Sequence, residues 1–173
     1  MASAFGGIDG KRASVNSDYF RAGDYITYLK AFKQAPNRAG LVNIIWEMTV
    51  VAVLDASTSA AEPRGPHRVG DSVSWLLSPT KHDMALPNCK AALMTIIGVP
   101  EASITQEFCD QLSSAAQPMK GYFVQWSNRV IQTKNGNPFT VIKPVRKLSK
   151  VEVERMIPAQ TLADLQIDTS KAD

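Results

Sequence analysis

The sequence predicts a mainly β fold: a five-stranded antiparallel barrel with a helical segment between strands 3 and 4 and a C-terminal extension. Two observations lead to this prediction. Five segments carry strand signals bounded by turn residues, whereas between the third and fourth segments apolar residues recur at helical spacing. The length of 173 residues fits one domain with tails. The strands are expected over residues 24–33, 41–55, 72–77, 121–133 and 138–147.

The second segment shows the alternation most clearly. Ile44, Trp46 and Met48 fall on one face and Glu47 on the other, so one face is expected to be buried, with Trp46 in the core. A polar segment with several Pro and Gly residues follows over 57–70, and we expect it to be a long exposed loop.

Helical spacing replaces the alternation after the third strand. Leu86, Cys89 and Leu93 share a stripe that ends at Gly98, which places Cys89 in the core of the domain. A second short helix is expected to begin with Ser103 as its N-cap, because a Gln follows three residues later.

The order of strands and helix matches the OB-fold, a five-stranded Greek-key barrel. An unrelated five-stranded sandwich is the alternative architecture. The chain is therefore divided into a loose Gly/Ser/Ala-rich arm over residues 1–20, an OB-fold nucleic-acid-binding domain over 21–148, and a partly helical extension with a polar tail over 149–173.

The last two strands are separated by Asn135-Gly136, the strongest short-range signal for a β-hairpin. Pairing the strands about a two-residue turn at this site places Asn128 opposite Lys143 and Trp126 opposite Val145.

Charge is distributed unevenly along the chain. The sequence has 19 Lys and Arg against 16 Asp and Glu, for a net charge of +3. Between Gln111 and Val151 there are seven basic residues and no acidic one. A segregated positive segment produces a local field that attracts polyanions, although a solvated basic face is the simpler alternative.

Basic and aromatic residues are interleaved on the first strand and on the last hairpin, a pattern typical of single-strand binding. Phosphates require cations, and unpaired bases stack on flat π surfaces. Tyr28, Phe32 and Trp126 are expected to be exposed, whereas Trp75 fits a core position equally well. The predicted phosphate contacts are Lys30, Lys33, Arg129, Lys143, Arg146 and Lys147. The predicted stacking residues are Tyr28, Phe32, Trp75, Tyr122 and Trp126.

The sequence does not indicate an enzyme. It has no Walker glycine loop, no G-x-S-x-G and no H-E-x-x-H, and its two His and two Cys are scattered, so we expect neither a metal site nor a cofactor. No run of 18 apolar residues is present, and the first residues do not form a signal peptide. We therefore expect a cytoplasmic protein.

Two short segments carry a resemblance to a known family. Ala22-Gly23-Asp24-Tyr25-Ile26 opens the first strand, and Lys134-Asn135-Gly136-Asn137-Pro138-Phe139 leads into the last one. With the order of elements over about residues 20–148, these segments resemble bacteriophage-encoded OB-fold single-stranded DNA-binding proteins. The resemblance implies a protein of the host cytoplasm that coats and protects single-stranded DNA during replication and recombination. It implies no sequence preference, and possible contacts with replication or recombination proteins or with further copies of itself.

The tail departs from that family. Many single-strand binders end in a strongly acidic tail that recruits partners, whereas this chain ends in Lys171-Ala172-Asp173. We therefore expect no recruitment through the tail, and we expect the apolar residues of 151–165 to pack on the barrel or on a partner.

Two other functions fit the same sequence. The chain could be a phage structural or assembly protein whose β-rich body makes protein–protein contacts, which predicts a large oligomer without salt-sensitive DNA affinity. It could also be an OB-fold that binds RNA or a protein target, because a fold does not determine its ligand.

Overall fold

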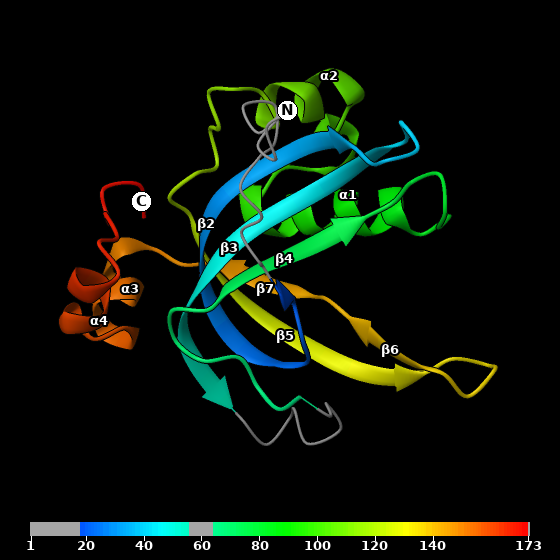
Figure 1. Ribbon diagram of the computed structural model, residues 1–173. Helices are drawn as coiled ribbons and strands as arrows, with labels where there is room; N and C mark the ends of the chain where they lie inside the picture. The colour runs from blue at the N-terminus through cyan, green and yellow to red at the C-terminus, as the bar shows by residue number, and fades with distance from the viewer. Residues whose placement is uncertain (1–17, 56–63, 173) are drawn as a thin grey trace, which may run out of the picture.

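The computed structural model describes residues 18–55 and 64–172, and it shows a mainly β chain with short helices (Figure 1). The mainly β class is therefore confirmed. The strands are β1 (Asp18–Tyr19), β2 (Gly23–Pro36), β3 (Val42–Asp55), β4 (Ser72–Leu77), β5 (Phe123–Gln132), β6 (Pro138–Val141) and β7 (Pro144–Lys147). The helices are α1 (Ala85–Ile97), α2 (Gln106–Leu112), α3 (Lys150–Met156) and α4 (Ala159–Asp164), with a 3-10 turn at Glu101–Ser103.

The strands form one curled, mixed sheet in the order β1-β4-β3-β2-β5-β6, with β7 also paired to β5. The long strand β2 pairs antiparallel with β3 on one side and with β5 on the other. The expectation of an entirely antiparallel set is wrong, because β1 pairs parallel to β4. β1 is only two residues long and falls in the segment expected to be a loose arm, where no alternation marks a strand.

β-Bulges explain the curvature of β2. Its pairing with β3 shifts register at three places between Asp24 and Ala31, and each such irregularity bends and twists a strand. Tyr25 and Ile26 point to opposite faces of the strand and are both fully buried, Tyr25 in the main core and Ile26 in a second apolar cluster. The sheet therefore has both faces covered at this end.

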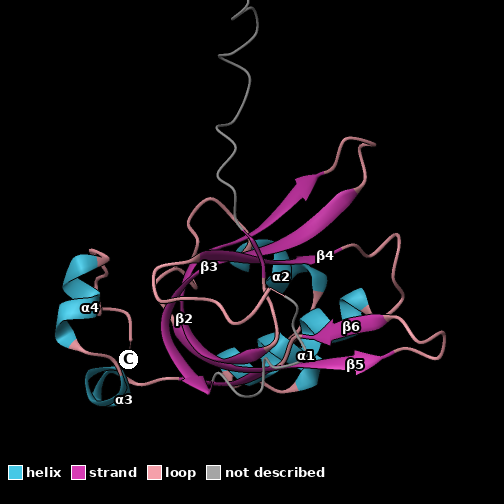
Figure 2. Cartoon of the chain, turned by 60° about the horizontal axis from the view of Figure 1, so that its bottom comes forward, coloured by secondary structure: helices cyan, strands magenta, loops and turns pink. Residues whose placement is uncertain are grey.

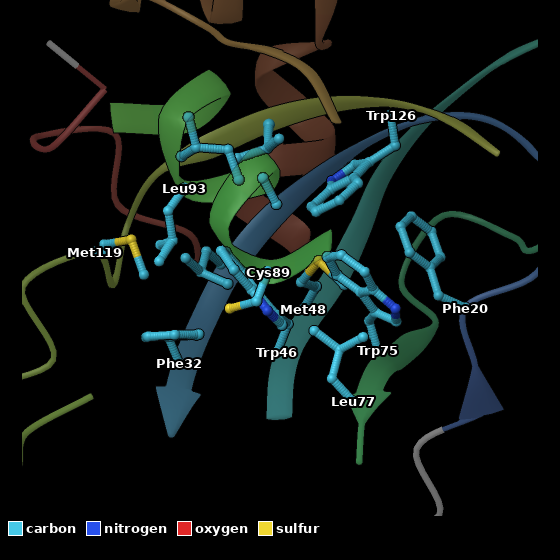
Figure 3. Close-up of a cluster of buried hydrophobic side chains, with 14 of the residues drawn as sticks. Phe20, Phe32, Trp46, Met48, Trp75, Leu77, Cys89, Leu93, Met119 and Trp126 are labelled. Carbon is cyan, nitrogen blue, oxygen red and sulfur yellow. The ribbon is translucent and has the colours of Figure 1, made fainter. Parts of the chain in front are cut away.

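The main core is built around three tryptophans (Figure 3). The rings of Trp46, Trp75 and Trp126 lie with centroids 5.9 to 6.4 Å apart, and Cys89 of α1 packs beside them. Tight contacts of this kind between large rings stabilise a core beyond the area that they bury. The core positions predicted for Trp46 and Cys89 are confirmed.

The last hairpin turns through three residues rather than two. The N–H of Thr133 donates to the Asn137 carbonyl (2.9 Å), and Gly136 takes the left-handed conformation (φ 77°) that closes a three-residue hairpin loop. Trp126 consequently pairs with Pro144. The predicted register, with Trp126 opposite Val145, is wrong by one residue because the turn is one residue longer.

The helices follow the predicted change of period. α1 ends at Gly98 as expected. The cap of α2 is wrong by two residues: Thr105 precedes the helix, and its hydroxyl accepts the N–H of Phe108 (3.2 Å). Ser103 instead ends the 3-10 turn, which the sequence analysis did not predict.

The C-terminal extension packs on the outer face of the sheet, at the opposite end from the β5–β6 hairpin (Figures 1 and 2). Val153, Ile157 and Leu162 cover Ile26 and Phe123. A capping box formed by Ser149 and Glu152 starts α3. The expected packing of this segment on the sheet is confirmed for Ile157 and Leu162, whereas Val151 is exposed.

Candidate nucleic-acid interface

A groove of about 960 Å³ lies between the β4 edge of the sheet and the β5–β6 hairpin. One wall comes from β1, β4 and the segment around Arg64, and the other from Ile131 to Ile142. The residues that lead into α1, from Ser78 to Ala85, line it as well. The groove therefore joins segments that lie more than a hundred residues apart in the sequence.

Aromatic and apolar side chains line both walls of the groove. Tyr19 of β1 is 64% exposed and Phe139 of β6 is 54% exposed, and both line the groove. Leu76, Met84 and Ile131 add further exposed apolar surface. Exposed aromatic rings on strands offer stacking surfaces for unpaired bases.

Positive side chains lie on one side of the groove. Arg64 of the β1–β4 wall and Lys81 of the segment that leads into α1 are exposed, while Arg21 is largely buried and contacts Arg64. Asp18 lies 3.5 Å from the Arg64 guanidinium and 3.7 Å from that of Arg21. Among the described residues that line the groove, Arg21, Arg64 and Lys81 are basic and Asp83 is acidic.

Three of the five predicted stacking residues are buried. Trp126 is 0% exposed, Phe32 is 2% exposed and Trp75 is 8% exposed. The expected exposure of Phe32 and Trp126 is wrong. The bulge between Leu29 and Ala31 turns Phe32 inward against Trp46. The indole N–H of Trp126 donates a hydrogen bond to Thr27 inside the core. Trp75 lines the groove only with the small part of its ring that is accessible.

The other two predicted stacking residues are half-buried and lie away from the groove. The Tyr28 ring packs edge-on against Phe123 near the C-terminal helices, and burial together with the charge of Asp168 raises the pKa of Tyr28. The Tyr122 ring lies 4.3 Å beneath the ammonium of Lys147. A lysine over a tyrosine face is a cation–π contact, which already occupies one face of that ring.

The predicted cations are spread over several surfaces. Lys30 and Lys143 are exposed. The other cations have acidic or aromatic partners: Lys33 pairs with Glu47, Arg146 with Glu152, and Arg129 makes two bonds to Asp24 (2.7 and 3.2 Å), which raise the pKa of Arg129. Lys147 covers Tyr122. The structure therefore does not gather these residues into one patch.

Sequence reasoning missed four residues of the groove. Tyr19 and Arg64 lie in segments expected to be a loose arm and an exposed loop, and no pattern singles out Lys81. Phe139 belongs to the hairpin segment but is not among the predicted stacking residues. Its position directly after Pro138 on an uncharged edge strand is the one sequence signal that could have indicated an exposed ring.

The described residues contain no group of three His, Cys, Asp or Glu side chains arranged to hold a metal ion. Burial raises the pKa of the Cys89 thiol to about 12, so this sulfur stays protonated and unreactive at neutral pH. Within residues 18–55 and 64–172, no helix has the length and apolar character needed to cross a membrane.

Comparison with known proteins leaves the family open. None of the protein-family models matches this chain, and none of the curated proteins does either.

Proposed function

We propose that this chain binds single-stranded DNA without sequence preference, as a non-enzymatic domain of the OB type, and that the groove receives the strand. The observation that carries the proposal is the groove itself. It places exposed rings on two facing walls, with exposed cations near one of them, around a space large enough for nucleotides.

The strand pairing supports the OB interpretation. β2 pairs with β3 and β5, β3 pairs with β4, and β5 pairs with β7, while α1 follows the third long strand. In OB-folds, oligonucleotides bind on the face of strands 2 and 3 and between the loops that follow strands 1 and 4. Here the corresponding third strand is β4, and the β5–β6 hairpin carries the corresponding second loop. The groove lies between β4 and the strands of this hairpin.

The chemistry of the groove suits a single strand. Stacking on Tyr19 and Phe139 would contribute roughly 1–3 kcal/mol per base regardless of base identity. Arg64 and Lys81 would neutralise phosphates, and the release of counterions would make binding weaken at high salt. In a duplex the base faces are already stacked, so the rings would have little to bind.

A role in phage replication or recombination follows from the resemblance of the sequence and belongs to the same proposal. In the family it resembles, acidic tails recruit partners. Here Ala172 is fully buried against the C-terminal helices. Partner recruitment would therefore use another surface of the molecule.

The test is a titration of labelled oligo-dT followed by fluorescence anisotropy at two salt concentrations, with a duplex of equal length as the control. We expect saturable binding to the single strand that weakens at high salt, and much weaker binding to the duplex. Equal affinity for both, or no binding to either, would contradict the proposal.

A second function is favoured by one observation. The edge strand β6 carries no charge and exposes Phe139 and Val141, beside Ile131 of β5. Natural edge strands usually carry charges that prevent pairing with other chains. An assembly protein would use this edge for protein–protein contact, and sedimentation analysis would then show a stable oligomer that oligo-dT does not disturb.

A further inference from the structure

A buried histidine lies behind the β1–β4 wall of the groove. The side chain of His67 is fully buried, and the rings of Phe20 and Tyr25 pack around it with centroids 6.0 and 5.5 Å away. Its backbone N–H donates to the Tyr25 hydroxyl (3.2 Å), which in turn donates to the Ala22 carbonyl (2.6 Å). The imidazole is therefore held in one place by its own backbone and by two aromatic rings.

Both ring nitrogens of His67 face Arg21. Nε2 accepts the backbone N–H of Arg21 at 2.9 Å, and Nδ1 lies 3.0 Å from the Nη2 of the same residue. Asp71 Oδ2 lies 3.5 Å from Nδ1 on the other side. Because Nε2 accepts, Nδ1 of the neutral ring carries the proton and can donate only toward Asp71. The ring therefore holds Arg21 through its main chain and only packs against its guanidinium.

The Arg21 side chain also contacts residues of the groove wall. Its Nη1 donates to the Arg64 carbonyl (3.0 Å), and its Nη2 lies 3.7 Å from Asp18 in β1. Asp18 in turn lies 3.5 Å from the Arg64 guanidinium. Because Tyr19 follows Asp18 in β1, this network fixes both the exposed ring and the exposed cation of the wall.

We propose that His67 is the positioning residue of the groove. As a neutral imidazole it holds Arg21, and through Arg21 it keeps Tyr19 and Arg64 where a single strand would contact them. The inference rests on the proposed function, since it concerns the same groove.

The geometry requires the neutral ring. A neutral imidazole keeps one nitrogen lone pair that can accept a hydrogen bond, whereas an imidazolium carries N–H on both nitrogens and accepts none. Protonation would leave the Arg21 backbone N–H without its acceptor and would set two positive charges together. Burial is the largest influence on the ring and lowers the pKa of His67, and the charge of Arg21 lowers it further. The charges of Asp71 and Asp18 act in the opposite direction.

The test follows the oligo-dT affinity of the full chain from pH 7.5 downward, through and below the ordinary histidine pKa of about 6.5, for the wild type, His67→Gln and His82→Gln. Glutamine can still accept the Arg21 N–H but does not titrate. His82 also lines the groove, but it is exposed and is the matched histidine control. We expect wild-type affinity to fall about tenfold on acidification, the equivalent of one stacking contact. We expect His67→Gln to show no such fall and His82→Gln to retain it.

Arg21→Lys provides a second variant, because it keeps the positive charge without the paired contacts. It should bind more weakly than the wild type already at pH 7.5, because the guanidinium contacts to Arg64 and Asp18 are lost. Its backbone N–H can still donate to His67, so the pH-dependent fall should remain. If the wild type and His67→Gln share one pH profile, the positioning role of His67 is overturned while DNA binding stands.

If the wild type does not bind oligo-dT at pH 7.5, the proposed function fails instead. The amide NMR signals of Tyr19 and Arg21 then decide the positioning role. Their chemical shifts should change as His67 is protonated in the wild type and should stay constant in His67→Gln. Chemical shifts that do not change with His67 protonation would overturn the inference.

Discussion

Within the core, the indole Nε1 of Trp126 donates a hydrogen bond of 2.8 Å to the hydroxyl of Thr27. Both residues are fully buried, and the bond joins the β5 and β2 strands at the point where β2 is shared between its two neighbours. Trp126 is therefore a structural residue of the sheet. A ring in this position is not accessible for stacking on a nucleotide.

We expect Trp126→Ala to lower the free energy of unfolding by about 3–5 kcal/mol, because it removes a large buried ring and leaves a cavity. Urea denaturation measures this change. The affinity for oligo-dT per folded molecule should remain unchanged. A loss of affinity without a loss of stability would indicate that Trp126 contacts DNA.

Phe139→Ala should weaken oligo-dT binding by roughly 1–3 kcal/mol, because this ring is an exposed stacking surface on the groove. The melting temperature should hardly change, since the ring is not part of the core. Val151→Ala is the matched control, because Val151 is an exposed apolar residue of α3 outside the groove. An equal effect in both variants would argue against the groove.

Replacing Arg64 and Lys81 together by Gln should reduce the slope of log affinity against log salt by about 1.4, because each phosphate contact of a single strand contributes about 0.7. Anisotropy titrations over a range of salt concentrations give this slope. Lys143 and Lys147, predicted from sequence, form the comparison pair. If replacing Lys143 and Lys147 lowers the slope and replacing Arg64 and Lys81 does not, the bound DNA strand runs along β7 and not through the groove.

Stability should depend on pH through His67. Its pKa in the folded chain is lowered, so folding favours the neutral ring. The contribution is therefore complete above about pH 6.5, the ordinary histidine pKa, and is lost as the pH falls toward the lower folded value. Urea midpoints measured between pH 7.5 and pH 5 should decrease on acidification, and His67→Gln should flatten that part of the curve.

Ser149→Ala should destabilise the C-terminal extension by about 1 kcal/mol, because the Ser149 hydroxyl caps α3 and shares a capping box with Glu152. Hydrogen exchange of the α3 amides reports this locally. Ser170→Ala serves as a control, since Ser170 is an exposed serine of the same extension whose hydroxyl bonds to Asp168. Equal exchange in both variants would mean that the cap contributes little.

Local signals in the sequence determined the elements of this chain. Alternation placed β3 and β4 with errors of at most one residue at either end, the helical stripe located α1, and Trp46 was correctly placed in the core. These features depend on a residue and its near neighbours, because a strand or helix exposes its faces at a fixed period.

Tertiary structure alone decided which aromatic rings are exposed and where the groove lies. The bulge before Phe32 and the three-residue turn at Gly136 each displace the register by one position, and a single displacement reverses the direction of a side chain or changes its partner. The groove combines Tyr19, Arg64, Lys81 and Phe139, which come from four separate segments. No pattern along the chain brings them together, because their proximity is a consequence of how the sheet curls.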